Sequence, residues 1–140
     1  KDILVLSNGE KVPPADLEGA IAMDPLVEQV MVVGEGKSYL SALIVVDGDK
    51  WPGFAQDQGL DPFKATSLVD ERVENAVIKR IRNALKSFPG FAKIRRVTLM
   101  LEPWTVDDDL LTPTMKVRRA RINERFRADI ARMYEGHVTS

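Results

Sequence analysis

Two apolar runs in the first half of the chain constrain its fold most. One extends from Val27 to Val33, the other from Tyr39 to Val46, and Gly34-Glu35-Gly36-Lys37 joins them. Both runs are rich in valine and isoleucine, and their lengths of seven and eight residues are typical of strands. Because the connection is short and contains glycine, the sequence predicts a pair of antiparallel strands.

A long helix, a third strand and a last helix follow these runs. Apolar residues recur at helical spacing from Val69 to Leu85, and charged residues occupy the opposite face. The alternation from Val97 to Leu101 predicts the third strand. The inner face of the last amphipathic helix is expected to consist of Ile122, Phe126, Ile130 and Met133.

The N-terminal region predicts a hairpin and a short helix. Ile3 to Leu6 and Lys11-Val12 form the two strands, and Asn8-Gly9 is the signal for a two-residue turn. Pro13-Pro14 opens a helix that Asp24-Pro25 ends. We therefore expect an α+β fold with a small antiparallel or mixed sheet of about three strands, flanked by helices and preceded by a two-stranded hairpin.

Composition excludes several classes of protein. A chain of 140 residues suits one domain, residues 1–140, and a net charge of −1 gives no overall attraction to nucleic acid or membranes. Cysteine is absent, which excludes disulfides and thiolate chemistry and suits a reducing compartment. The one histidine, His137, lies in a polar tail, so Ser-His-Asp catalysis is excluded and a histidine metal site is not favoured.

No apolar run reaches the ~20 residues that cross a bilayer. The start at Lys1, without methionine, favours a domain excised from a longer protein.

Three consecutive carboxylates, Asp107-Asp108-Asp109, are a candidate cation site. Neighbours in sequence rarely converge on one ion unless a turn is built for it. A solvated loop is therefore the favoured interpretation, and no metal site is expected on this chain.

A basic run near the C-terminus has a net charge of +5, because Glu124 and Asp129 are its only acids. Its cations are Lys116, Arg118, Arg119, Arg121, Arg125, Arg127 and Arg132. The run could contact nucleic acid phosphates, an acidic partner surface or only solvent. No nucleic-acid motif or aromatic interleaving accompanies it, so nucleic acid is not expected as a partner.

The segment from Leu110 to Lys116 delivers a lysine just before the last helix. A compact ammonium on a loop can enter a crowded anionic site and neutralise a phosphate or carboxylate. The alternative is an ordinary surface lysine.

Segments at both ends of the chain carry a resemblance to a known family. They are Lys1-Asp2-Ile3, Asn8-Gly9-Glu10, Val12 to Glu18, Val32-Val33-Gly34, Glu102 to Val106, and Asp109 to Lys116. In this order the chain resembles the C-terminal domain of acyl-adenylate-forming enzymes, specifically the long-chain fatty acyl-CoA synthetases. Met115 stands where many members have glycine, and this departure favours the long-chain branch.

The resemblance implies a two-step reaction. A fatty acid and Mg-ATP give an acyl-adenylate and pyrophosphate, and coenzyme A then displaces AMP to give the thioester. The family's large N-terminal adenylation domain, the expected partner, holds ATP, Mg2+ and the acyl chain. The present chain is therefore expected to act as a rotating lid, to bind no cofactor alone and to be inactive alone.

The resemblance also assigns roles to residues. Lys116 would be the catalytic lysine of adenylation, where it neutralises negative charge at the acyl carboxylate and α-phosphate. The pair Lys1-Asp2 would be the hinge of the rotation. The loop Ser7-Asn8-Gly9 would line the coenzyme A tunnel after rotation, since backbone at glycine approaches a ligand closely.

Two alternatives stay open at this stage. The chain could belong to another acyl-adenylating enzyme, such as one that passes its acyl group to a carrier protein. It could also be a stand-alone module that binds an anion or nucleic acid through the basic run. A cytoplasmic location is expected, with peripheral membrane contact left open, and the acyl chain length is not fixed by this sequence.

Overall fold

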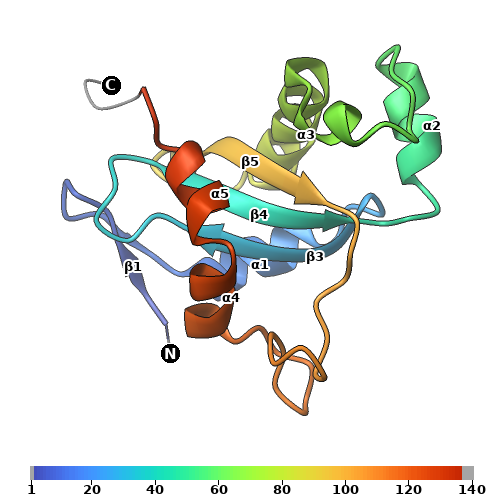
Figure 1. Ribbon diagram of the computed structural model, residues 1–140. Coiled ribbons are helices and arrows are strands. Elements are labelled where there is room, and N and C mark those ends of the chain that lie inside the picture. The colour runs from blue at the N-terminus through green and yellow to red at the C-terminus, as the bar shows by residue number, and fades with distance from the viewer. Residues whose placement is uncertain (1, 137–140) are drawn as a thin grey trace.

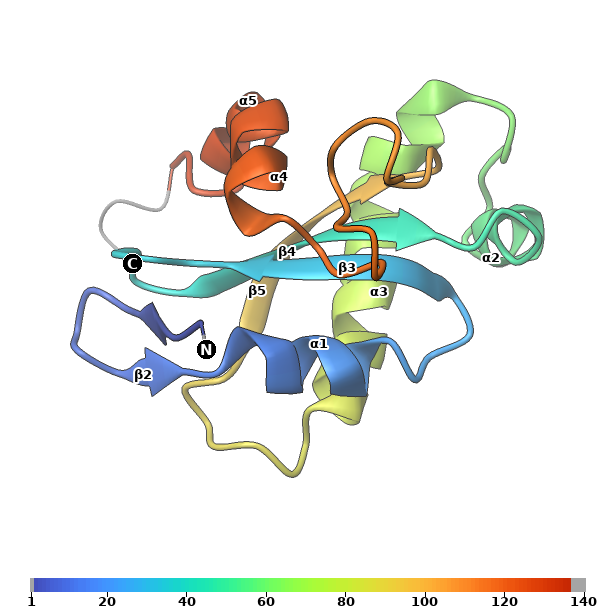
Figure 2. The same cartoon turned by 90° about the horizontal axis from the view of Figure 1, so that it is seen from below.

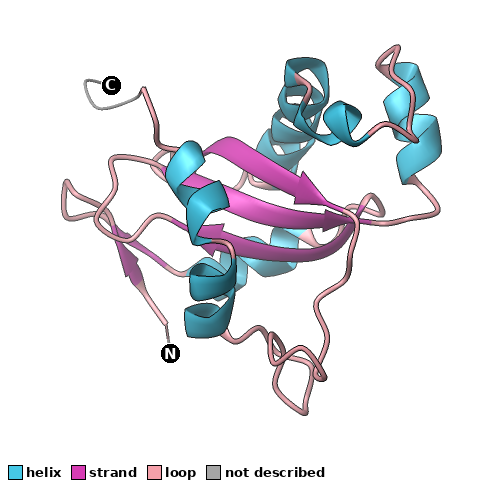
Figure 3. Ribbon diagram, viewed as in Figure 1, coloured by secondary structure: helices cyan, strands magenta, loops and turns pink. Residues whose placement is uncertain are grey.

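In the computed structural model, which describes residues 2–136, the two central apolar runs pair as antiparallel strands (Figure 1). The elements in chain order are β1 (Leu4–Val5), β2 (Lys11–Val12), α1 (Pro14–Ile21), β3 (Val27–Val33), β4 (Leu40–Val46), α2 (Trp51–Asp57), the 3-10 helix η1 (Ala65–Val69), α3 (Glu71–Ala84), β5 (Ile94–Met100), α4 (Arg119–Arg125) and α5 (Arg127–Arg132). Strands and helices are mixed along the chain (Figure 3), and the predicted α+β class is confirmed. Among residues 2–136, none of the helices has the length and hydrophobicity that a membrane crossing requires.

The three-stranded sheet has the order β3-β4-β5 and is mixed. Val30 of β3 lies opposite Ile44 of β4 in the antiparallel pair. Leu99 of β5 lies opposite Ile44 on the other edge of β4, in the parallel direction. Parallel neighbours need a crossover connection, and residues 47–93 provide it through α2, η1 and α3.

Both faces of the sheet are covered, and this explains why β4 is an uninterrupted apolar run. All 7 residues of β4 are buried. Because alternate side chains of a strand point to opposite faces, Ala42 and Ile44 join the core under α1 and α3. Leu43 and Val45 join a second core under α4 and α5. Figure 2 shows the two layers of helices on opposite sides of the sheet.

The long helix begins later than its apolar spacing suggests. The spacing places Val69 on the inner face of this helix, and that prediction is wrong, since Val69 lies in η1 and is 73% exposed. α3 begins at Glu71 because Asp70 is its N-cap, whose carboxylate accepts a hydrogen bond from Arg72 N–H at 2.9 Å. The third strand also ends one residue early, and Leu101 lies beyond it, 37% exposed.

The last amphipathic helix is two helices, α4 and α5, so the prediction of a single helix is wrong. Phe126, with φ −110° and ψ 28°, separates them. Phe126 N–H still donates to Ile122 O at 3.0 Å, and Ile130 N–H donates to Phe126 O at 2.9 Å. The apolar spacing therefore continues through the break, and Ile122 and Met133 are buried as predicted.

Candidate active site

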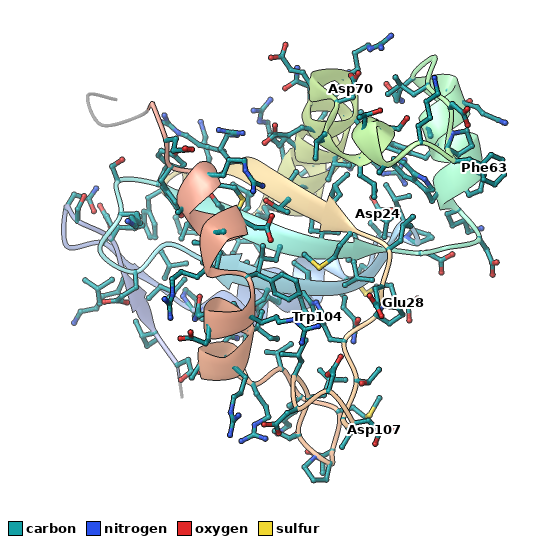
Figure 4. The ribbon with its side chains drawn as sticks, viewed as in Figure 1. Asp24, Glu28, Phe63, Asp70, Trp104 and Asp107 are labelled. Carbon is teal, nitrogen blue, oxygen red and sulfur yellow. The ribbon has the colours of Figure 1, made fainter. Side chains whose placement is uncertain are left out.

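The loop of residues 101–118, between β5 and α4, carries the candidate lysine and is anchored on the sheet. Trp104 is 2% exposed, and its backbone exchanges two hydrogen bonds with the Gln29 side chain of β3. Gln29 Nε2 donates to Trp104 O at 2.9 Å, and Trp104 N–H donates to Gln29 Oε1 at 2.7 Å. In Figure 4, Trp104 lies against the sheet and Asp107 lies on the outer part of the loop.

Lys116 lies at the exposed end of a tight turn. Met115 N–H donates to Thr112 O at 2.8 Å, and Pro113 occupies the second position of the turn, where its fixed φ is favourable. Thr112 N–H donates to Lys116 O at 2.8 Å, and Lys116 N–H donates to Thr112 Oγ1 at 3.0 Å. The backbone of Lys116 is thus held on both sides. Its side chain is exposed, and its ammonium makes no ion pair with any residue between 2 and 136.

Met115 has a left-handed backbone, with φ 68°, and its side chain is 65% exposed. This conformation costs a residue with a side chain about 1 kcal/mol or more, whereas glycine adopts it freely. The turn before Lys116 therefore favours glycine at this position on conformational grounds.

The loop Ser7-Asn8-Gly9 forms the exposed turn between β1 and β2. Leu6 N–H donates to Glu10 O at 2.9 Å, and Gly9 N–H donates to Leu6 O at 2.9 Å. The turn therefore holds three residues, one more than the two-residue signal of Asn8-Gly9 indicates, and Gly9 absorbs the extra residue with φ 90°.

The connection between β3 and β4 fixes this hairpin from the side. Ser7 N–H donates to Lys37 O, and Gly36 N–H donates to Val5 O, both at 2.9 Å. Glu35 adds a third contact, since its Oε1 accepts from Val5 N–H at 3.0 Å. The β1–β2 turn is therefore attached to the sheet that carries the rest of the site.

Asp2, in the expected hinge pair, belongs to a network around Arg119. Arg119 Nη1 and Nη2 donate to the Glu18 carboxylate at 2.7 Å and 2.6 Å, and Arg119 Nε donates to Asp2 at 2.9 Å. Glu18 Oε2 also accepts from Val32 N–H at 2.8 Å. The hydrogen bonds to Glu18 raise the pKa of Arg119. Lys1, the other hinge residue, lies outside the described residues.

The predicted site residues do not converge within this chain. Figures 1 and 2 show the β1–β2 turn near one end of the sheet and the loop of residues 101–118 near the other. Lys116 and the loop Ser7-Asn8-Gly9 are therefore two separate exposed features.

Two of the three carboxylates in Asp107-Asp108-Asp109 make contacts with the loop or with the start of α4. Asp109 pairs with Arg118 and, at 2.7 Å, with Arg121. Desolvation raises the pKa of Asp108, but hydrogen bonds from the amides of Thr105 and Leu110 outweigh it and hold that pKa below its ordinary value. Residues 2–136 contain no group of three acidic or histidine side chains placed to hold a metal ion.

The basic run is largely neutralised by nearby acids. Arg118 and Arg121 share Asp109, and Arg119 pairs with Glu18 and Asp2. Arg127 and Arg132 pair with the acids of the run itself. Lys116 and Arg125 are the members of the run that form no ion pair within residues 2–136.

Sequence reasoning missed two of these features. Gln29 and Glu18 lie far from Trp104 and Arg119 in the sequence, so only the fold reveals their pairing. The sequence does carry a signal for a further basic segment, since residues 75–101 contain seven Lys and Arg residues and no Asp or Glu.

The fold and the site together describe an α+β domain that presents Lys116 on a tight turn, with no ion pair to that lysine within residues 2–136. The chain belongs to the family of AMP-binding enzyme C-terminal domains, which matches residues 1–138.

Relatives in this family are similar over nearly the whole chain. The chain is 33% identical over 138 residues to the long-chain-fatty-acid–CoA ligase FadD15 of Mycobacterium tuberculosis, covering 96% of this chain and 23% of that protein. It is 31% identical over 134 residues to the long-chain-fatty-acid–[acyl-carrier-protein] ligase AEE15, chloroplastic, of Arabidopsis thaliana, covering 96% of this chain and 17% of that protein. The chain thus spans about a fifth of the length of these relatives.

A solved structure supports the fold. The adenylation domain of a carboxylate reductase from Mycobacterium chelonae superposes with a TM-score of 0.79 at 24% identity, covering 94% of this chain and 19% of that one.

Proposed function

We propose that this chain is the mobile C-terminal domain of an AMP-forming long-chain fatty acid–CoA ligase and that it supplies Lys116 to the adenylation step. The proposal rests on the fixed backbone and the exposed ammonium of Lys116. Its backbone is fixed by Thr112, while its ammonium is exposed and has no anionic partner within residues 2–136. A cation held in this way can be presented to an anionic site on another domain.

The chemistry of the first step explains why a lysine is needed. A carboxylate oxygen of the fatty acid attacks the α-phosphorus of ATP, and pyrophosphate leaves with the electrons of the broken P–O bond. Two anions approach each other in this step, so a positioned ammonium stabilises the transition state more than the separated reactants. ATP and Mg2+ are held by the N-terminal adenylation domain in this proposal.

The second step assigns a role to the β1–β2 turn. After rotation about Lys1-Asp2, the exposed loop Ser7-Asn8-Gly9 lines the path of coenzyme A, whose thiol attacks the acyl carbon and releases AMP. The separation of this loop from Lys116 supports alternation, because a domain that serves two steps can use two separate surfaces. The domain is inactive alone in this proposal, and its location is cytoplasmic.

A second candidate differs in the acyl acceptor. In this candidate the acyl group passes to a carrier protein, which is the acceptor that the name of one relative states. A stand-alone nucleic-acid module has less support, because five of the seven cations in the basic run are already paired with carboxylates.

The test uses the longer protein that carries this domain, with Lys116→Ala compared with Lys64→Ala. Lys64 is also exposed and unpaired within residues 2–136, so it is a matched control. ATP-dependent formation of acyl-CoA and thioester formation from a synthetic acyl-adenylate are measured separately. Lys116→Ala should lower the overall rate by roughly 100-fold or more and leave the second step within about threefold.

Each result has a definite meaning. Equal loss in both steps, or equal loss in Lys64→Ala, would sink the assignment of Lys116. If the thioester forms only on an added carrier protein, the acyl acceptor is that protein and not coenzyme A, as the second candidate requires. Activity of the isolated 140-residue chain would contradict the need for a second domain.

A further inference from the structure

A second basic surface lies where α3 leads into β5. The segment from residue 75 to residue 101 has no acidic residue, and its cations are Lys79, Arg80, Arg82, Lys86, Lys93, Arg95 and Arg96. Arg80 and Arg96 are paired with Asp24 and Glu74. Arg82, Lys86 and Lys93 are exposed and form no ion pair within residues 2–136.

These three cations surround a shallow cavity of about 210 Å³ where α3 leads into β5. Apart from the cations, its lining is apolar or glycine, with Leu85, Phe88 and Ile94 among the lining residues. A base edge or a peptide backbone would find no neutral hydrogen-bonding side chain there. The cavity therefore suits an anionic group that is attached to an apolar body.

Phe91 lies at the tip of the connection from α3 to β5. Ala92 N–H donates to Pro89 O at 2.9 Å, which closes a turn with Phe91 at a central position. Phe91 is 38% exposed although it is a large apolar side chain. Figure 2 shows the connection from α3 to β5 projecting from the face opposite α4 and α5.

We propose that the segment of residues 82–94, from the last turn of α3 to the start of β5, docks on an anionic lipid surface, with Phe91 entering the interface and Arg82, Lys86 and Lys93 contacting the headgroups. Charge complementarity selects this partner, since unpaired cations beside an apolar tip are the combination that a negatively charged bilayer attracts. The connection from α3 to β5 projects on the other side of the sheet from the loop of residues 101–118, so docking leaves that loop free. This proposal stands independently of the proposed catalytic role.

The test is co-sedimentation of the 140-residue chain with vesicles of phosphatidylcholine alone or mixed with phosphatidylserine. We expect binding to the mixed vesicles, little binding to the neutral ones, and a decline with rising salt. Replacing Arg82, Lys86 and Lys93 together by Gln should weaken binding about 100-fold, a factor of about five for each cation. Phe91→Ser should weaken it several-fold without changing the salt dependence.

A matched control removes the same charge elsewhere. Lys11, Lys50 and Lys64 are exposed lysines outside this segment, and their joint replacement by Gln should change binding less than about threefold. Circular dichroism establishes that each variant is folded. Equal loss in the control triple, or no binding to mixed vesicles, would overturn the proposal. Release from vesicles by coenzyme A or by a single-stranded oligonucleotide, each acting through the same three cations, would assign the surface to soluble phosphates instead.

Discussion

Arg119 of α4 donates two hydrogen bonds to Glu18 of α1, at 2.7 Å and 2.6 Å, although the two residues are 101 positions apart in the sequence. The side chains are 19% and 12% exposed, so water screens the pair poorly. The same guanidinium holds Asp2 at 2.9 Å. One residue just after the Lys116 loop thereby fixes the N-terminal segment to α1.

Glu18→Gln should lower the free energy of unfolding by about 2 kcal/mol, because Arg119 loses its main partner and stays largely buried. Urea denaturation measures the change. Glu28→Gln is the control, since the Glu28 side chain is exposed and makes no hydrogen bond or ion pair within residues 2–136, and it should cost less than about 0.5 kcal/mol. Equal costs in the two variants would show that the Arg119–Glu18 pair adds nothing to stability.

Gln29→Leu should loosen the base of the loop of residues 101–118. The substitution removes the acceptor of Trp104 N–H and the donor to Trp104 O, so a loss of about 2 kcal/mol is expected. Hydrogen exchange at the Trp104 amide should accelerate more than exchange in β4. Unchanged exchange at Trp104 would mean that the buried indole alone holds the loop.

The ionised Asp24 carboxylate should stabilise the fold at neutral pH, and this stabilisation should be lost in acid. Hydrogen bonds from Arg80 Nε and Nη2, at 2.8 Å and 2.7 Å, lower the pKa of Asp24, although desolvation opposes them. A lowered folded-state pKa stabilises the fold above the unfolded-state value of about 3.9, and this contribution is lost as the pH falls through the folded-state value.

Asp24→Asn removes the charge and keeps an oxygen for Leu26 N–H. It should cost about 1 kcal/mol at neutral pH, since Arg80 is 44% exposed and solvent screens the pair. The difference from the unaltered chain should shrink below about pH 4. Asp107→Asn is the control, at an exposed carboxylate with no ion pair within residues 2–136, and it should cost less than about 0.5 kcal/mol at neutral pH. A constant difference from neutral to acid pH would contradict the role of the Asp24 charge.

The sequence predicts elements whose residues are close in the chain. The β-branched runs give β3 and β4, and the proline and apolar spacing gives α1. The same spacing fails at Val69 and at Phe126, because it records which residues face inward and is blind to a cap or a one-residue break.

Long-range features of the candidate site could not be predicted from local pattern. The parallel pairing of β5 with β4 depends on how residues 47–93 cross the sheet. The pairing of Arg119 with Glu18 follows from that topology and not from any motif. The segment from Leu110 to Lys116 predicts a lysine on a loop, whereas the left-handed conformation of Met115 is visible only in the structure.

Met115 offers a direct test of the turn that presents Lys116. Glycine at this position removes a conformational cost of about 1–2 kcal/mol from the folded state. It also destabilises the fold by about 0.4–1 kcal/mol, because glycine raises the entropy of the unfolded chain. Met115→Gly should therefore stabilise the chain by roughly 0.5 kcal/mol. Met115→Val should destabilise it by about 1 kcal/mol, because a β-branched residue tolerates φ 68° less well.

Met23 is the matched control, since its side chain is 82% exposed and its backbone φ is not positive. Met23→Gly should destabilise by about 0.5–1 kcal/mol, opposite in sign to Met115→Gly. Urea denaturation of the three variants gives the order. If both glycine variants lose stability equally, Met115 is not left-handed in solution, and the turn that fixes the Lys116 backbone does not form as described.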